Sequence, residues 1–167
     1  MTGLQSKGKK PSSCEAARHY ALKLLSYRGR SEKEMHQRLT QKGFPPETAA
    51  QTIEALRISG FLDDAALAEN LKREAFSRKM LSRSGARLYM LGRGVPRHII
   101  DATLSDDEKS DLANAKRIIE KKMKSLKNHD PEIIRRRLYN VLSRKGYASV
   151  TIRAALKDNY FCKEEDT

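Results

Sequence analysis

The apolar positions of this chain recur at helical spacing, and the same pattern comes back three times. A large apolar residue stands four positions before a glycine, and more apolar residues follow six and ten positions after it. Each glycine lies between a cation and an apolar residue, in Lys42-Gly43-Phe44, Arg93-Gly94-Val95 and Lys145-Gly146-Tyr147. The glycines are about 51 residues apart, which is typical of one structural unit used three times. We therefore predict a helix that ends at each glycine and a second helix just beyond it, since glycine suits the left-handed position that closes a helix.

Capping signals mark the other helix starts. A serine followed three residues later by glutamate forms a capping box, in which the two side chains satisfy free backbone N–H groups. An aspartate or a first-turn proline before an apolar stripe is also typical of a helix start. The N-caps predicted in this way are Ser12, Ser31, Asp63 or Asp64, Ser105 and Asp130. We interpret Asp63-Asp64 as a cap and not as a metal site, because adjacent carboxylates on a helix start do not converge on one ion.

These patterns predict an all-α fold of about nine helices, arranged as an elongated tandem array of three three-helix repeats. One helix pair cannot bury its own apolar face, so each unit needs a third helix or a neighbouring unit. No stretch alternates like a strand for more than three or four residues. The expected parts are a disordered basic arm over 1–11, repeats over 12–62, 63–104 and 105–158, and an acidic tail over 159–167.

Charge narrows the range of partners. The chain has 34 Lys and Arg against 21 Asp and Glu, a formal charge of +13, which favours a polyanion or an acidic protein surface as the partner. Cations next to the three glycines are explained largely by the helix dipole, which is negative at a C-terminus. The dipole does not explain the segment 78–97, which carries six cations and no acid, or the run Arg135–Arg137.

Catalytic signals are missing from the sequence. It contains no nucleophile elbow, no phosphate-binding P-loop and no HExxH zinc motif, and its four histidines are scattered. Cys14 and Cys162 stand near opposite ends and form no metal or redox spacing. We therefore expect a binding protein and not an enzyme, with no catalytic residue, no cofactor and no metal. Because no apolar segment resembles a signal peptide or a membrane span, we also expect a cytoplasmic protein. We expect it to act as a monomer.

Several stretches of the chain together carry a resemblance to a known family. They are residues 28–35, Leu39 with Lys42-Gly43-Phe44, and residues 60–64 followed by Leu67-Ala68. With residues 85–88, 93–95 and 144–147, they cover roughly residues 16 to 156. The resemblance is to the RecX regulatory proteins of bacteria. Its most specific part is the Leu62-Asp63-Asp64 turn between two helix units. Leu67 departs from the family, which usually has an aromatic residue there.

The resemblance implies a modulator of the RecA recombinase. Such proteins bind RecA and its nucleoprotein filament, lie along the filament groove, and limit filament growth, strand exchange and ATP hydrolysis. It also implies three-helix repeats and no catalytic centre. We expect RecA acids or DNA phosphates to meet a set of basic residues, and reversal of two of them, Arg87 and Arg136, to abolish inhibition of the RecA ATPase. The candidate contact residues are Arg83, Arg87, Arg93, Arg97, Arg135, Arg136 and Arg144.

Two other functions remain open on the sequence. A helix-turn-helix-like protein that binds DNA without RecA would give a sequence-specific footprint by itself. An enzyme with a site built from scattered residues would lose turnover when one polar residue in a pocket is changed.

Overall fold

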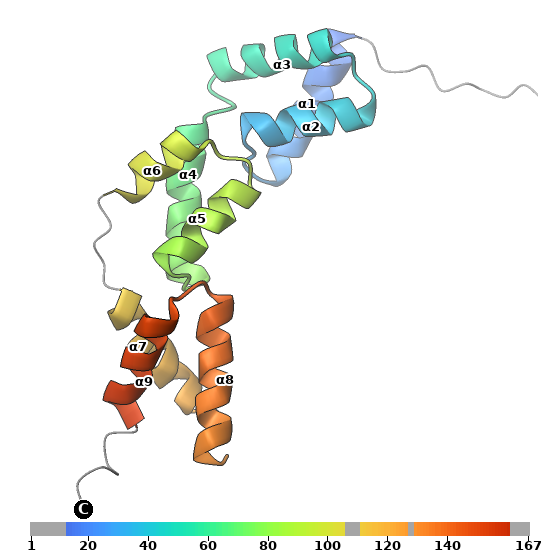
Figure 1. Ribbon diagram of the computed structural model, residues 1–167. Coiled ribbons are helices and arrows are strands. Elements are labelled where there is room, and N and C mark those ends of the chain that lie inside the picture. The colour runs from blue at the N-terminus through green and yellow to red at the C-terminus, as the bar shows by residue number, and fades with distance from the viewer. Residues whose placement is uncertain (1–12, 106–110, 127–128, 161–167) are drawn as a thin grey trace, which may run out of the picture. The chain divides into compact units, whose positions relative to one another are not determined.

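The computed structural model describes residues 13–105, 111–126 and 129–160, which form nine α-helices and no strand (Figure 1). The helices are α1 (Cys14–Tyr27), α2 (Glu32–Lys42), α3 (Pro46–Ile58), α4 (Asp64–Arg73), α5 (Arg83–Gly92), α6 (Arg97–Leu104), α7 (Asp111–Met123), α8 (Pro131–Arg144) and α9 (Ser149–Tyr160). A π-helical turn, η1 (Glu74–Arg78), continues directly from α4. The expected all-α fold with three-helix repeats is confirmed.

The chain forms two compact units. Unit 1 comprises Met1–Leu67 together with the turn Arg93–Pro96, and unit 2 comprises Ala68–Gly92 and Arg97–Thr167. The boundary between the units falls inside α4, and the turn that connects α5 to α6 belongs to unit 1. Each unit is therefore described by itself.

Unit 1 is built on α1, α2 and α3, which pack against one another. Their buried residues form one apolar cluster, which includes Ala17, Met35, Leu39, Phe44 and Leu56. Gly43 closes α2 with φ +94°, and the N–H of Phe44 donates to the Leu39 carbonyl at 3.1 Å. The turn thus folds Phe44 back onto the helix that it ends, as the sequence pattern predicts.

Most of the predicted caps are confirmed. The side chains of Ser31, Asp63 and Asp130 accept hydrogen bonds from backbone N–H groups in the first turns of α2, α4 and α8. The prediction for α1 was wrong by one residue. Because the helix begins at Cys14, the residue before it is Ser13, and Ser13 Oγ accepts from the N–H of Ala16 at 3.1 Å.

Some sequence predictions fall outside the described residues. The Ser105 capping box extends into 106–110, and α7 is described from Asp111. The predicted basic arm over 1–11, with Ser12, and residues 161–167 of the predicted acidic tail also lie outside the described part of the chain.

Unit 2 has its largest apolar cluster where α7, α8 and α9 meet. Ile119, Leu138, Leu142 and Ile152 are fully or almost fully buried there, and Met80 packs against the same cluster. Elsewhere in the unit, α5 packs on α6 and on η1. Lys72 Nζ on α4 donates to the Thr103 carbonyl on α6 at 2.8 Å, which ties these two helices together.

Two of the three glycine turns also seat on the start of another helix. In unit 1, Ser31 Oγ donates to the Arg93 carbonyl at 2.8 Å, and Arg93 Nη2 donates to the Gly29 carbonyl at 2.8 Å. In unit 2, the N–H of Ser82 donates to the Lys145 carbonyl at 3.1 Å, and Lys145 Nζ donates to the Lys79 carbonyl. We call this kind of contact, which is present in both units, the turn–cap joint.

The turn–cap joint follows the sequence repeat, because its two serines, Ser31 and Ser82, are 51 residues apart. The turn–cap joint is also a second reason, besides backbone conformation, why glycine is needed at Gly94 and Gly146. A Cβ at Gly94 would lie 2.5 Å from Ser31 Oγ, and a Cβ at Gly146 would lie 2.7 Å from Gly85 Cα. Neither position therefore has room for a side chain, whereas a Cβ at Gly43 would meet nothing within 4 Å.

Candidate functional site

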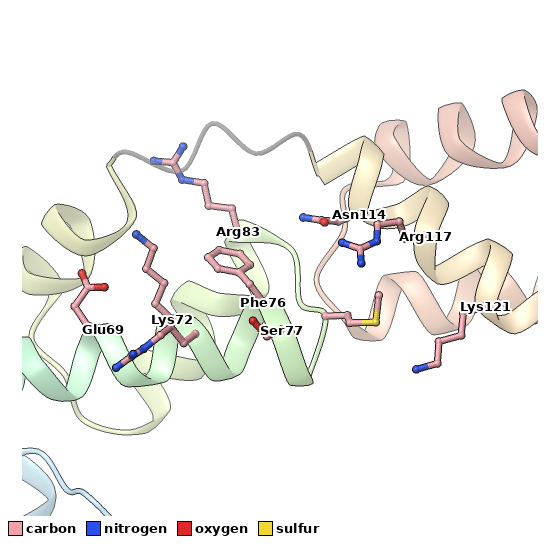
Figure 2. Close-up of a pocket in the computed structure, with 10 residues that line it drawn as sticks. Glu69, Lys72, Phe76, Ser77, Arg83, Asn114, Arg117 and Lys121 are labelled. Atoms are coloured by element: carbon pink, nitrogen blue, oxygen red, sulfur yellow. The ribbon is translucent and has the colours of Figure 1, made fainter.

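Unit 2 contains a hollow of about 590 Å³ whose walls are rich in cations. One wall is α4 with η1, which contributes Glu69, Lys72, Arg73, Phe76 and Ser77, and the other wall is α7, which contributes Asn114, Arg117 and Lys121. Arg83, at the start of α5, lies between these walls in Figure 2, and Met80 completes the lining. We call this site the basic hollow.

The backbone beside the basic hollow has two unusual conformations. The chain leaves α4 through the π-helical turn η1, and two residues later Met80 adopts φ +52°, which is rare for any residue other than glycine. Hydrogen bonds fix this segment, since the Leu81 N–H donates to the Ala75 carbonyl at 2.9 Å and Tyr147 Oη donates to the Met80 carbonyl at 3.3 Å. π-Helical turns and strained residues of this kind cluster at functional sites.

Among the described residues, cations outnumber carboxylates around the basic hollow. The described lining contains five cations and one carboxylate, that of Glu69. The side chains of Arg83, Arg117 and Lys121 are exposed and make no hydrogen bond or ion pair within the described part of the chain. Among the described residues, nothing therefore competes with an external anion for these three side chains.

The pKa of Lys145 reflects the same excess of positive charge near the basic hollow. Burial lowers the pKa of its ammonium group, and the nearby charges of Lys122, Lys79 and Lys121 lower this pKa further. Lys145 is held in place despite this repulsion, because its ammonium group donates to the Lys79 carbonyl in the turn–cap joint. An anion bound nearby would relieve the repulsion.

The seven arginines expected from the sequence to form a contact surface do not gather at one place. Arg83 alone among them lines the basic hollow. Arg87 forms an ion pair with Asp101 across α5 and α6, with 2.5 Å between Nη1 and Oδ1. Arg97 is exposed at the start of α6 and has no side-chain partner among the described residues.

Arg93 takes part in a charge network inside unit 1. Glu34 accepts hydrogen bonds from Arg28 and Arg30, and its Oε2 lies 3.9 Å from Arg93 Nε. Burial alone would raise the pKa of Glu34, but the Arg28 hydrogen bond and the charges of Arg30, Arg28 and Arg93 together lower it. Because only 18% of the Arg93 side chain is exposed, this residue supports the turn–cap joint more than it offers a surface to a partner.

Three of the seven arginines lie on α8. Arg135 and Arg136 line a shallow depression of about 360 Å³ together with Ile133 and Tyr139, two apolar residues that are each 36% exposed. We call these four residues the α8 face. Tyrosine and arginine beside an exposed aliphatic residue are typical of a protein-binding surface. Arg144 lies at the end of the same helix and lines a different depression with Lys122 and Arg137.

Sequence reasoning missed four cations of the basic hollow, namely Lys72, Arg73, Arg117 and Lys121. One signal for them was present, because Arg117 and Lys121 are four residues apart and so share a face of α7. Which helix that face would oppose depends on tertiary packing, and the sequence pattern does not contain it.

The described residues contain no group of three or more His, Cys, Asp or Glu side chains that could hold a metal ion. Among the same residues, every helix is too short or too polar to cross a membrane.

Comparison with known proteins identifies relatives along most of the chain. The family model "RecX, first three-helix domain" matches residues 17–56, and the model "RecX, third three-helix domain" matches residues 109–156. The Regulatory protein RecX of Pelodictyon phaeoclathratiforme is 32% identical over 146 residues, which cover 87% of this chain and 90% of that protein. The Regulatory protein RecX of Amycolatopsis mediterranei is 29% identical over 143 residues, which cover 85% of this chain and 82% of that protein.

Solved structures agree on the fold. The crystal structure of RecX from Lactobacillus salivarius superposes with a TM-score of 0.69 at 18% identity, covering 87% of this chain and 95% of that one. Another crystal structure of regulatory protein RecX gives a TM-score of 0.71 at 22% identity, covering 87% of this chain and 73% of that one. The two domain models, the relatives matched over most of their length and the shared three-helix repeats lead to one conclusion: this chain belongs to the RecX family of regulatory proteins.

Proposed function

We propose that this protein binds the RecA recombinase, alone or as a filament on DNA, and limits filament extension, strand exchange and ATP hydrolysis. The observation that carries the proposal is the match, over more than 80% of their length, to relatives named Regulatory protein RecX. The formal charge of +13 supports it, because a nucleoprotein filament presents phosphates and protein carboxylates. In this role the protein has no catalytic centre and acts in the cytoplasm, in DNA repair and recombination.

Within this proposal, the α8 face is the surface that contacts RecA. Arg136 is exposed and has no side-chain partner among the described residues, so its guanidinium is free to pair with a carboxylate. Tyr139 and Ile133 beside it would bury apolar area in the same contact. Arg135 belongs to the same face, and Arg83, Arg97 and Arg144 stay as further candidates outside it. Arg87 is a poorer choice for charge reversal, because a glutamate there would repel its partner Asp101.

The test adds the purified full chain to preformed RecA filaments on single-stranded DNA and follows ATP hydrolysis and filament length. We expect inhibition, and we expect the double substitution Arg136→Glu with Tyr139→Ala to weaken it at least tenfold. The matched control is Arg38→Glu with Tyr27→Ala, two exposed residues of unit 1 that undergo the same chemical changes. Circular dichroism checks that both variants stay helical.

Each outcome has a definite meaning. If the unaltered protein leaves RecA filaments unchanged, the RecA proposal fails, and a sequence-specific DNA footprint in its place would favour a DNA-binding role without RecA. If both double variants inhibit equally well, the α8 face is not the contact surface.

A further inference from the structure

We propose that the basic hollow of unit 2 is a binding site for two or three consecutive phosphate groups. Such a run of phosphates is present in a polynucleotide strand and in a nucleoside triphosphate. The inference concerns a different surface from the α8 face and does not depend on RecA, so it can fail or hold independently of the proposed function.

The first argument is the set of unpaired cations. Arg83, Arg117 and Lys121 come from two different helices, line one hollow and have no acidic partner within the described residues. In most proteins, exposed cations of this kind are scattered or paired with carboxylates. Arginine offers a planar fork that matches two phosphate oxygens, and lysine offers a compact point charge, so together they suit a phosphate ligand.

The second argument is the spacing of the cations. Arg117 and Lys121 are four residues apart on α7, which places them about 6 Å apart along the helix axis. Lys72 and Arg73 stand on the opposite wall, in the last turn of α4. Figure 2 shows the walls facing each other across the hollow. Charges spaced along one wall and repeated on the other fit several phosphates in a row better than a single anion.

The third argument is that the site is preformed. The π-helical turn η1 and the left-handed Met80 shape its lining, and the turn–cap joint holds this segment through Tyr147 and Lys145. Lys72 is also fixed, because its ammonium group donates to the Thr103 carbonyl at 2.8 Å. A preformed site loses less conformational entropy when it binds than a flexible tail of the same charge would lose.

Phe76 contributes an aromatic ring to the basic hollow, which the binding of phosphate alone would not require. Its ring is partly buried in the same wall as Lys72, within the lining of the hollow. An aromatic face next to a row of cations is the combination by which proteins hold a single nucleic-acid strand, because a base can stack where the phosphates are bound. The same ring could take the base of a free nucleotide.

The experiment measures binding to the full chain without RecA. One probe is a fluorescein-labelled oligothymidine of about 20 nucleotides, followed by anisotropy, because one module that tracks a strand covers about 4–16 nucleotides. The other probe is a fluorescent analogue of ATP. The test variant is Arg117→Gln with Lys121→Gln, and the matched control is Arg18→Gln with Lys23→Gln on α1, which removes the same charge from exposed positions in unit 1.

We expect the Arg117/Lys121 variant to bind at least one probe tenfold or more weakly, and the control to stay within twofold of the unaltered protein. Because each phosphate contact on a single strand contributes about 0.7 to the salt slope, the slope of log affinity against log salt for the oligonucleotide should fall by about 1.4. If the Arg117/Lys121 variant loses oligonucleotide binding, and ATP does not displace the oligonucleotide from the unaltered protein, the site is assigned to a polynucleotide strand. If the variant loses binding of the ATP analogue, the site is assigned to a free nucleotide.

Two results would overturn the inference. In the first, both variants weaken binding equally, which would mean that the overall charge attracts the probes and that the hollow contributes nothing specific. In the second, neither probe binds the unaltered protein at low salt. Circular dichroism and a second variant, Arg83→Gln, separate loss of the site from loss of the fold, since Arg83 has no side-chain partner among the described residues to disturb.

Discussion

Tyr147, the residue after the third repeat glycine, is fixed inside unit 2 by both its ring and its hydroxyl group. Its ring is almost fully buried in the cluster formed by α7, α8 and α9, and its hydroxyl donates to the Met80 carbonyl at 3.3 Å. Burial raises the pKa of the phenol to about 12, with a smaller contribution from the negative charge of Asp111. The folded structure therefore favours the neutral form of the Tyr147 hydroxyl.

This pKa shift predicts how stability depends on alkaline pH. An unfolded tyrosine ionises near pH 10, so the stabilisation from the neutral Tyr147 hydroxyl is fully present below about pH 10 and is lost as pH rises toward 12. In a titration of phenolate absorbance, the Tyr147 phenol should therefore give a late component. Tyr147→Phe should remove this late component, and the control Tyr27→Phe, at a residue 73% exposed, should leave it in place. Identical late components in both variants would contradict the assignment.

At the scale of one turn, Gly43 and Gly146 have nearly the same backbone but different surroundings. Their φ angles are +94° and +85°, so each helix end requires the left-handed conformation. Around Gly43 there is open space, whereas the backbone of Gly85 lies against Gly146. The two turns thus separate the contribution of backbone conformation from the contribution of packing in the turn–cap joint.

Alanine substitution at these two glycines should give unequal effects. Gly43→Ala should lower the free energy of unfolding of unit 1 by about 1–2 kcal/mol, the penalty for a left-handed residue with a Cβ. Gly146→Ala should lower the free energy of unfolding of unit 2 by about 3 kcal/mol or more, because the added Cβ must also displace backbone only 2.7 Å away. Urea unfolding followed by circular dichroism measures both. Equal losses would mean that the joint in unit 2 adapts to the extra atom.

The sequence was sufficient for most of the elements and insufficient for their contacts. Helix ends at Gly43, Gly94 and Gly146 could be predicted, because the left-handed conformation is a local requirement. Local spacing was less decisive for α1, where two adjacent serines could each cap the helix and the structure selects Ser13. The turn–cap joint could not be predicted, since it connects residues 62 or more positions apart.

For the candidate site too, the sequence predicted where cations are concentrated but did not predict which residues they contact. Charge counting found the segment 78–97 and the α8 arginines, because an excess of cations is visible in the composition. It did not show that Arg87 pairs with Asp101 or that Arg93 packs near Glu34, since both contacts arise from packing between helices. For the same reason it could not place Arg117 and Lys121 opposite Lys72.

At the scale of the whole molecule, the described residues include two separate apolar clusters, one in unit 1 and one where α7, α8 and α9 meet in unit 2. The cluster of unit 1 includes Leu39 and the cluster of unit 2 includes Leu142, and both side chains are fully buried. Repeat proteins whose neighbouring units carry their own cores often unfold in parts, with stabilities that belong to each part. A single free energy of unfolding then describes the molecule poorly.

Native-state hydrogen exchange can test this independence. Leu39→Ala and Leu142→Ala should each remove about 2–5 kcal/mol from the cluster that loses the side chain. We expect Leu39→Ala to lower amide protection in α1, α2 and α3 while protection in α7, α8 and α9 stays unchanged, and Leu142→Ala to give the reverse. A uniform loss of protection in either variant would show that the two units unfold as one.

The open space above Gly43 has a consequence for how such a protein can lengthen during evolution. A duplicated module fused ahead of α1 would need to bring only a serine that donates to the turn carbonyl, because the Lys42-Gly43-Phe44 turn already has the conformation that seats on such a serine. Growth behind α9 would require more substitutions to form a joint like that of unit 1, because the cap of α8 is Asp130, whose carboxylate accepts from the Glu132 N–H and cannot donate as the Ser31 hydroxyl does. Gene duplication should therefore extend this architecture more readily at its amino end.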